Sequence, residues 1–210
     1  AMSAKAVPLY NAVKEFIANE VEPVTEKYFA LGEGRPDRWQ YGEGQLELLD
    51  ELKRKARAKG LWNFFLPNSE TGEGLSNLDY AYIAVELGKS PLASECLNCS
   101  APDTGNMEVL ERVGTPEQKE KWLKPLLNGE IRSAYVMTEP DVASSDAKNL
   151  QCRAELDGDE WVITGQKVWT TGAHYSDIGE IMTRTDWNLP KHKGLTAFII
   201  DFKDPNVEVR

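Results

Sequence analysis

The segment 135–147 combines residue types that could bind a ligand with many hydrogen-bond acceptors. An apolar stretch leads there into a loop that carries the hydroxyl side chains of Thr138, Ser144 and Ser145. Hydroxyl groups and the backbone amides of such a loop can both donate hydrogen bonds to a ligand. The same pattern also fits an ordinary turn, so the loop indicates a binding site without establishing one.

A second segment, residues 165–173, reads Gly-Gln-Lys-Val-Trp-Thr-Thr-Gly-Ala. It places the large aromatic surface of Trp169 beside the hydroxyls of Thr170 and Thr171. Periodicity alone is also consistent with Trp169 as a core residue. Taken together, these two segments are the best candidates in the chain for a binding site.

Other common kinds of site are not indicated. No Gly-x-Gly-x-x-Gly follows a predicted strand and no Gly-x-x-x-x-Gly-Lys is present, so neither a Rossmann nucleotide site nor a P-loop is expected. Cys96 and Cys99 form a Cys-x-x-Cys pair, but Cys152, His174 and His192 lie at no zinc-ligand spacing from them. We therefore expect no metal site, and free thiols that are buried or half-buried.

The composition is that of an ordinary globular protein. The 210 residues carry 34 acidic and 24 basic groups, a formal net charge of −10. Nucleic acids and anionic membrane surfaces attract positive patches, so neither is an expected partner. No apolar run approaches the roughly 20 residues of a membrane-spanning helix. Three cysteines are too few for a disulfide framework, which favours a reducing compartment: the cytoplasm, or mitochondria or peroxisomes in a eukaryote.

The elements that must position these segments fall into two regions. Residues 3–131 show helical spacing of apolar residues, glycine stops at Gly60 and Gly88, and helix starts at Ser76 and Thr115. A helix from Lys5 would have to accommodate a proline at position 23. This region is predicted to be an all-α domain.

Residues 132–210 instead show short runs typical of strands. The predicted strands cover residues 134–137, 152–156, 160–164, 168–171, 180–185 and 195–202, with Asp157-Gly158-Asp159 as a hairpin turn. Strands at short intervals without intervening helices favour an antiparallel barrel or sandwich. The fold class is therefore α+β, an all-α domain followed by an antiparallel β domain.

The two candidate segments resemble signature segments of the acyl-CoA dehydrogenase family of flavoproteins. That family has a Thr-Glu-Pro strand and loop that ends in Ser-Asp, and a later Gly-x-Lys-x-Trp-x-Thr strand. Three stretches, 98–108, 118–126 and 142–146, are similar to a subgroup typified by the higher-numbered animal acyl-CoA dehydrogenases and their bacterial relatives. Residues 193–198 also fit the family. The resemblance covers essentially the whole chain.

The loop departs from the commoner family pattern, Glu-Pro-x-x-Gly-Ser-Asp. Residues 139–146 read Glu-Pro-Asp-Val-Ala-Ser-Ser-Asp, which is one residue longer and has serine where glycine is usual. Counting back from Asp146 makes Ser145 the residue that matches the family's ligand-contacting serine. The alternative, Ser144, stays open.

The resemblance implies FAD as cofactor and acyl-CoA as substrate. The residues that would line or hold the flavin are Tyr135, Met137, Thr138, Ser145, Trp169, Thr170 and Thr171. Those nearest the acyl-CoA would be Ser145, Ala101 and Asp103, the last two from a loop that helps to wall the acyl pocket. Hydrogen-bond donors near the flavin ring favour its reduced form, so these residues tune the cofactor.

The reaction implied by the resemblance is α,β-desaturation of an acyl-CoA thioester. A carboxylate in a water-poor site, where its pKa rises, removes the α-proton. In the family this base is a glutamate on a C-terminal helical bundle, whereas this chain ends at Arg210, and Glu139 belongs to the structural Thr-Glu-Pro element. We therefore expect a fragment with no catalytic residue of its own, weak or absent flavin binding, and no turnover.

The resemblance also implies partners for the intact parent protein, and leaves its function partly open. The parent is expected to be a homo-oligomer, a dimer or tetramer, with an electron-transferring flavoprotein as acceptor. A non-catalytic scaffold or partner-binding subunit is an alternative that the missing base favours and the retained ligand-facing residues disfavour. An acyl-CoA oxidase, which passes electrons to oxygen, is not separated from a dehydrogenase by the sequence.

Overall fold

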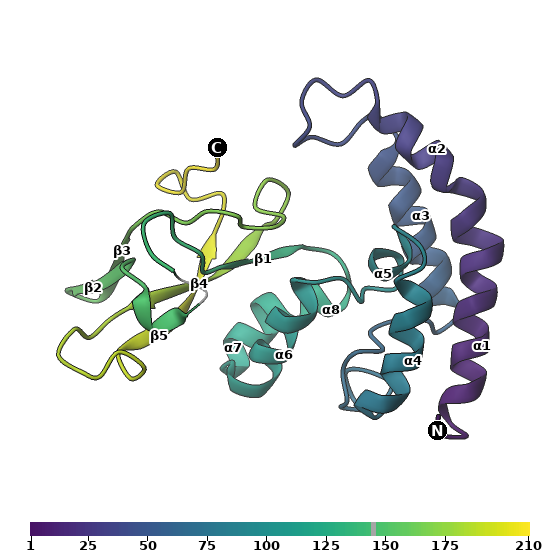
Figure 1. The fold of residues 1–210 in the computed structure, drawn as a ribbon, viewed down its shortest axis with the longest axis horizontal. Helices are drawn as coiled ribbons and strands as arrows, with labels where there is room; N and C mark the ends of the chain where they lie inside the picture. The colour runs from purple at the N-terminus through teal and green to yellow at the C-terminus, as the bar shows by residue number, and fades with distance from the viewer. Residues whose placement is uncertain (144–145) are drawn as a thin grey trace. The chain divides into compact units, whose positions relative to one another are not determined.

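The computed structural model describes residues 1–143 and 146–210. Ser145, the expected ligand contact, and Ser144, its alternative, lie outside the described residues. The chain separates into two compact units, Ala1–Glu130 and Ile131–Arg210, and Figure 1 shows the first as helical and the second as built around a sheet. The predicted α+β class, with helices before strands, is confirmed.

The first helical stretch of the chain accommodates its proline through a wide turn. Helix α1 (Ala6–Phe16) continues into a π-helical turn, η1 (Ile17–Val21), and then into α2 (Glu22–Gly32). The backbone N–H of Glu22 donates to the carbonyl of Ile17, five residues earlier. Pro23 therefore stands in the first turn of α2, where its missing N–H breaks no hydrogen bond of the helix.

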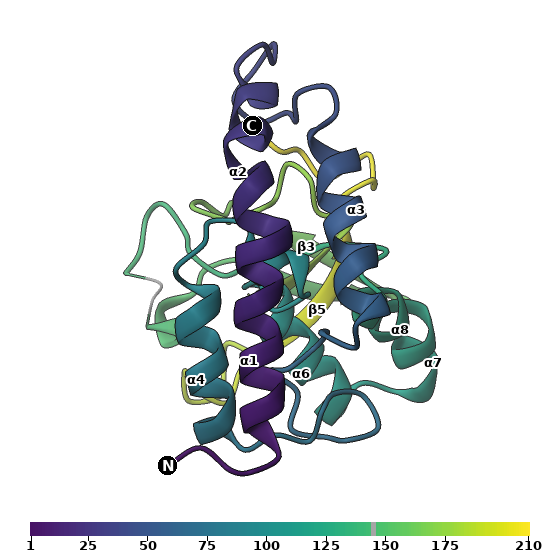
Figure 2. The same ribbon diagram turned by 90° about the vertical axis from the view of Figure 1, so that its right-hand side faces the viewer.

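The other helices of this unit begin where the sequence supplies capping residues. The Ser76 hydroxyl accepts from the amide of Asp79 at the start of α4 (Asn77–Leu87), and Thr115 with Gln118 forms a complete capping box. Helix α1 packs against α4, as Figures 1 and 2 both show. The remaining elements are α3 (Gln45–Ala58), α4 (Asn77–Leu87), α5 (Ala93–Cys96), α6 (Asp103–Val113), α7 (Pro116–Gln118), η2 (Lys119–Leu123) and α8 (Lys124–Leu127).

The second unit contains one five-stranded sheet. Its elements are β1 (Ser133–Val136), the 3-10 turn η3 (Ala147–Asn149), β2 (Arg153–Asp157), β3 (Glu160–Thr164), β4 (Ile178–Arg184) and β5 (Leu195–Asp201). The strand order is β1-β4-β2-β3, and β5 also pairs with β4. Strands β2 and β3 form the predicted antiparallel hairpin, and β4 pairs with β5 antiparallel.

The sheet is mixed, so the expectation of a purely antiparallel domain is wrong in this detail. Strand β1 pairs with β4 in parallel, and β2 joins β4 in parallel through a single residue pair. A parallel pair needs a long crossover connection. Here the β2–β3 hairpin and its flanking loops provide that connection, and nothing in the local sequence pattern distinguishes it from successive hairpins.

One predicted strand is absent from the described sheet. Residues 168–171 form an irregular segment, although the backbone N–H of Val168 donates to the carbonyl of Thr138 at 2.8 Å. The apolar face of the sheet lies elsewhere, where Ala134, Val136 and Ile181 pack with Cys152. All three cysteines of the chain are buried and free, as expected. No helix in residues 1–143 and 146–210 is long and apolar enough to cross a membrane.

Candidate functional site

Strand β1 presents Tyr135 on the face opposite the apolar core. Ala134 and Val136 are buried, whereas Tyr135 is 41% exposed, as the alternation of side chains along a strand requires. The Tyr135 hydroxyl donates to the sulfur of Met137 at 3.7 Å. Thr138 follows and is half-buried. Tyr135 thus lies within β1, and Met137 and Thr138, the other two of these residues expected to line a flavin, follow directly at its carboxyl end.

A buried lysine ties the end of β1 to the segment that carries Trp169. The ammonium group of Lys167 donates to the Oε1 atom of Glu139 at 2.9 Å, and to the backbone carbonyls of Met137 at 2.9 Å and Met182 at 2.7 Å. The side chains of Lys167 and Glu139 are 6% and 5% exposed. Three acceptors from three parts of the unit thus saturate the ammonium group.

The carboxylate of Glu139 also accepts several hydrogen bonds. It accepts hydrogen bonds from the backbone amides of Gln151 at 2.7 Å and Cys152 at 2.9 Å, in addition to that from Lys167. Burial acts to raise its pKa, but these hydrogen bonds and the lysine charge together hold the pKa of Glu139 below its ordinary value. A carboxylate stabilised in this way is a poor base, which supports its assignment to structure.

Trp169 is held in a strained and exposed position. Its φ of 57° lies in the left-handed region, which a bulky side chain rarely adopts, and its side chain is 89% exposed. The alternative in which Trp169 fills the core is therefore wrong. The preceding residues Lys167 and Val168 anchor the segment to the end of β1. Strain of this kind persists only where the surroundings impose it, and it often marks a ligand site.

The neighbours of Trp169 add hydroxyl groups to the same segment. Thr170 is half-buried, and its carbonyl accepts from the amide of Ala173 at 3.3 Å in a tight turn. Thr171 is exposed. Gly172 has a φ of 83°, and a Cβ there would lie 3.1 Å from the Tyr175 hydroxyl, so glycine suits this turn.

Arg184 hydrogen-bonds to backbone carbonyls of the segment that follows the loop with Ser144 and Ser145, and of a later loop. Its guanidinium donates to the carbonyls of Leu150 at 3.1 Å, Lys148 at 2.7 Å and Lys191 at 3.2 Å, and the side chain is buried. An arginine can satisfy several carbonyls at once because its five N–H groups have a fixed geometry. The position of Ser145 itself lies outside the described residues.

The two residues expected near the acyl chain belong to the helical unit. Ala101 is exposed, and Asp103 is the buried first residue of α6. An acidic residue at this place complements the positive end of a helix, so a negative charge here has a structural explanation. Their contact with an acyl group therefore stays a prediction.

Glu180 is a polar residue of the sheet that sequence reasoning did not single out. It lies on β4 directly opposite Tyr135 of β1, and the residue is 4% exposed. Within the part of the chain that the structure describes, its Oε1 atom has no hydrogen-bond partner. Burial raises its pKa to about 7, and both burial and the nearby Glu180 carboxyl raise the pKa of Tyr135.

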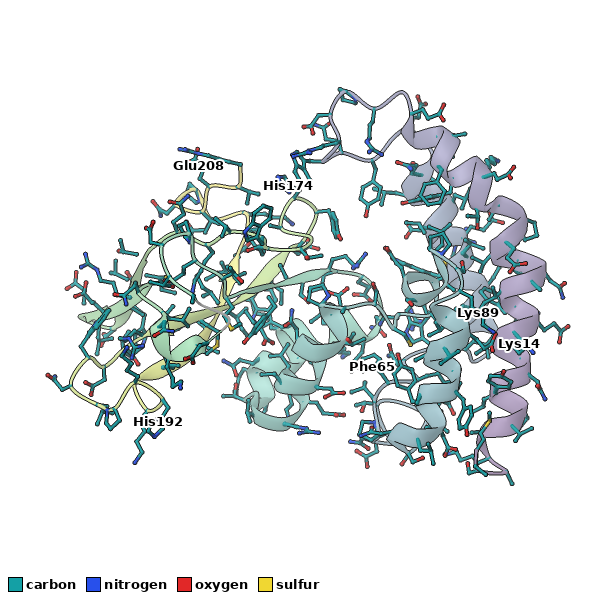
Figure 3. The ribbon with its side chains drawn as sticks, viewed as in Figure 1. Lys14, Phe65, Lys89, His174, His192 and Glu208 are labelled. Atoms are coloured by element: carbon teal, nitrogen blue, oxygen red, sulfur yellow. The ribbon has the colours of Figure 1, made fainter. Side chains whose placement is uncertain are left out.

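The side chains of the two candidate segments, residues 135–147 and 165–173, suit a flat aromatic cofactor better than a metal ion. An exposed indole, threonine hydroxyls and a half-exposed tyrosine can pack against a ring and hydrogen-bond to its edge. His174 and His192 lie at separate ends of their unit in Figure 3. Across residues 1–143 and 146–210, no three His, Cys, Asp or Glu side chains form a group that could hold a metal ion.

Comparison with known proteins identifies the family of the chain. Residues 5–130 match the model of the acyl-CoA dehydrogenase N-terminal domain, and residues 134–210 match that of the acyl-CoA dehydrogenase middle domain. Acyl-CoA dehydrogenase family member 11 of Gallus gallus is 43% identical over 213 residues, which cover 99% of this chain and 26% of the relative.

Bacterial relatives are similar over the same length. The probable acyl-CoA dehydrogenase FadE2 of Mycobacterium tuberculosis is 40% identical, over 100% of this chain and 51% of its own length. A solved structure from Mycobacterium abscessus, classed with the acyl-CoA dehydrogenases, has a TM-score of 0.89 and 46% identity, over 98% of this chain and 52% of the other. The chain thus spans between a quarter and a half of these relatives, and it belongs to the acyl-CoA dehydrogenase family.

Proposed function

We propose that these residues form part of an FAD-dependent acyl-CoA dehydrogenase, which introduces an α,β double bond into an acyl-CoA thioester. Family membership supports an oxidoreductase that uses FAD. The observation that carries the proposal to this chain is Trp169, an exposed indole in a strained conformation that a buried ion pair anchors to the end of β1. A ligand that covers the indole would explain why this side chain is held in an exposed and strained conformation.

The proposal gives the described residues distinct tasks. Trp169 packs against the isoalloxazine ring, Tyr135 lines it from β1, and Met137 lines it from the position that follows β1. Hydroxyl groups of Thr138, Thr170 and Thr171 donate to its polar edge, which favours the electron-rich form of the ring. The Lys167–Glu139 pair keeps these two segments in register.

When bound, FAD would supply the acceptor for the hydride that leaves the β-carbon. Glu139 is not the group that removes the α-proton, because its hydrogen bonds stabilise the carboxylate. Glu180 has the raised pKa that a base needs, but a substrate carbon cannot reach the carboxyl of a residue that is 4% exposed. No carboxylate among these 210 residues is assigned as the base.

The remaining assignments complete the proposal. Ser145 contacts the flavin or the pantetheine part of CoA, and Ala101 and Asp103 help to wall the acyl pocket. An electron-transferring flavoprotein takes up the electrons, and the enzyme is a homo-oligomer. These assignments follow the family and are tested separately from the flavin site.

The test compares flavin content and reduction in the full-length protein. The purified protein is expected to show flavin absorbance in the near ultraviolet and blue, and the blue band is expected to bleach when an acyl-CoA is added without oxygen. Peroxide formed on admitting air would favour an oxidase, and an electron-transferring flavoprotein that is reduced at the same rate would favour a dehydrogenase. A protein with no flavin, even after incubation with FAD, would contradict the proposal and favour a scaffold.

A matched pair of tryptophan variants tests the role of Trp169. The Trp169→Ala variant is expected to lose flavin affinity by about ten-fold or more, as the loss of one aromatic stacking contact predicts. Trp187→Ala removes another exposed tryptophan of the same unit and is expected to bind FAD normally. Equal affinity in the two variants would remove Trp169 from the flavin site.

A further inference from the structure

The sheet face that carries Tyr135 also holds a buried carboxyl group with no function in the proposal so far. Glu180 of β4 and Tyr135 of β1 are register partners in the parallel β1–β4 pair, so their side chains leave the sheet on the same face. Ile199 of β5 faces Glu180 from the other side. The carboxyl group therefore has one polar neighbour in register, the tyrosine, and one apolar neighbour.

A buried carboxyl without a partner is costly when it is ionised. In the described residues no donor reaches the Oε1 atom of Glu180, unlike Glu139, which accepts from three donors. Protonation removes the cost of burying an unpaired charge. Consistent with this, burial raises the pKa of Glu180 to about 7, within the range in which a cell's pH can change its charge.

The charged groups on the surrounding strands do not offer Glu180 a counter-ion. On β5 the charged residue of this face is Asp201, which is exposed and accepts from the amide of Lys203 at 2.8 Å. On β4 the guanidinium of Arg184 lies four residues further on and is bonded to three carbonyls. On β1 the titratable neighbour is Tyr135, whose pKa burial and the Glu180 carboxyl both raise.

The hydroxyl of Tyr135 is weakly held. Its acceptor is the thioether sulfur of Met137 at 3.7 Å, and thioethers are weak acceptors. An ionised carboxylate is a far stronger acceptor than a thioether. When Glu180 loses its proton, it therefore competes with Met137 for the hydrogen of the Tyr135 hydroxyl.

We propose that Glu180 is a proton-dependent positioning residue for Tyr135. With the proton on Glu180, the tyrosine hydroxyl stays with Met137 and the ring keeps the orientation seen here. When the proton leaves, the hydroxyl turns toward the carboxylate and the ring moves with it. The consequence for flavin binding rests on the proposed function, which places Tyr135 against the ring, whereas the movement itself does not.

The movement is tested by NMR on the 210-residue chain without any ligand. Side-chain carboxyl carbons of glutamate and ring carbons of tyrosine are labelled, and Glu180→Gln and Tyr135→Phe assign the two signals. In the wild type the Glu180 carboxyl signal is expected to titrate with a midpoint near 7, and the Tyr135 ring signal is expected to shift with the same midpoint. In Glu180→Gln, which has the same shape but cannot ionise, the Tyr135 signal is expected to stay constant between pH 5.5 and about 8.5.

A control variant shows whether the effect is specific to Glu180, and several results would contradict the proposal. Asp201→Asn removes an exposed carboxylate from the same face of the sheet, and its Tyr135 signal is expected to titrate as in the wild type. A Glu180 midpoint near the ordinary value for glutamate would overturn the proposal. So would a Tyr135 signal that is constant in the wild type or titrates unchanged in Glu180→Gln.

A second measurement separates this proposal from the proposed function. If the proton-bearing form alone binds FAD well, a midpoint near 7 predicts about a ten-fold loss of FAD affinity in the full-length wild type from pH 6 to pH 8. Glu180→Gln is expected to show no such loss. A full-length protein that never binds FAD would refute the proposed function, and the tyrosine titration would still decide whether Glu180 positions Tyr135.

Discussion

Replacing Lys167 by methionine removes the ammonium group that joins β1, the Trp169 segment and β4. The substitution leaves the Glu139 carboxylate buried with its backbone N–H donors Gln151 and Cys152, and it leaves the carbonyls of Met137 and Met182 without this donor. Breaking a buried ion pair on one side costs about 3–5 kcal/mol. Because these backbone donors remain on Glu139, we expect the lower end, about 3 kcal/mol of lost unfolding free energy.

The assay is urea denaturation followed by circular dichroism, with the double variant Lys167→Met/Glu139→Gln as the second arm. The glutamine has no charge to leave unpaired, so the double variant is expected to lose less than the sum of the two single losses, by about 1 kcal/mol or more. Lys124→Met breaks an exposed ion pair with Glu120 and is expected to unfold at the wild-type urea concentration. A loss below about 1 kcal/mol for Lys167→Met, or additive losses, would refute the reasoning.

Three further predictions concern single side chains. The pKa of Glu180 is raised in the folded state, so its favourable contribution to folding stability is present below about pH 4 and disappears as the pH rises through about 7. In thermal unfolding, the Glu180→Gln variant should therefore lose less stability over this pH range than the wild type. At pH 8 the variant should be more stable than the wild type by at most about 3 kcal/mol, and by less where solvent screens the charge. Thr115→Ala removes the capping box of α7 and should cost about 1 kcal/mol in urea denaturation, whereas an unchanged midpoint would show that the cap contributes nothing. Trp169→Gly should be more stable than Trp169→Ala by about 1 kcal/mol, because glycine alone adopts the left-handed φ freely, and the reverse order would show that the strain is absent.

The helix starts could be predicted because their causes are local. Thr115 and Gln118 satisfy each other's backbone amides within four residues, so the capping box is visible in the sequence. The π-helical turns were not predicted, although both have the same cause. η1 (Ile17–Val21) precedes Pro23 and η2 (Lys119–Leu123) precedes Pro125, and in both the following helix begins with the proline in its first turn. A proline lacks a backbone N–H, and at a position two residues after such a turn this missing donor breaks no hydrogen bond of the helix.

Local sequence signals predict some strand pairs of the sheet but not others. The turn at Gly158 determines the β2–β3 hairpin because the two strands are adjacent in sequence. The parallel pairing of Ser133 with Ile178 joins residues far apart in the chain, and no turn signal specifies it. It depends instead on Val136 and Ile181 meeting on the apolar face, which only the assembled sheet shows.

The same distinction explains which parts of the candidate site were predictable. Trp169, Thr170 and Thr171 stand in a recognisable segment, but the left-handed conformation and exposure of Trp169 come from anchors at Thr138 and Lys167, which are supplied by the fold. Glu180 is one acidic residue within a strand, and the sequence gives it no distinguishing neighbour. Its significance depends on its pairing with Tyr135 and on the lack of a donor at Oε1 in the described part of the chain. A residue type indicates what a side chain can do, but burial and partners determine whether its charge is stable, and only the three-dimensional structure contains those.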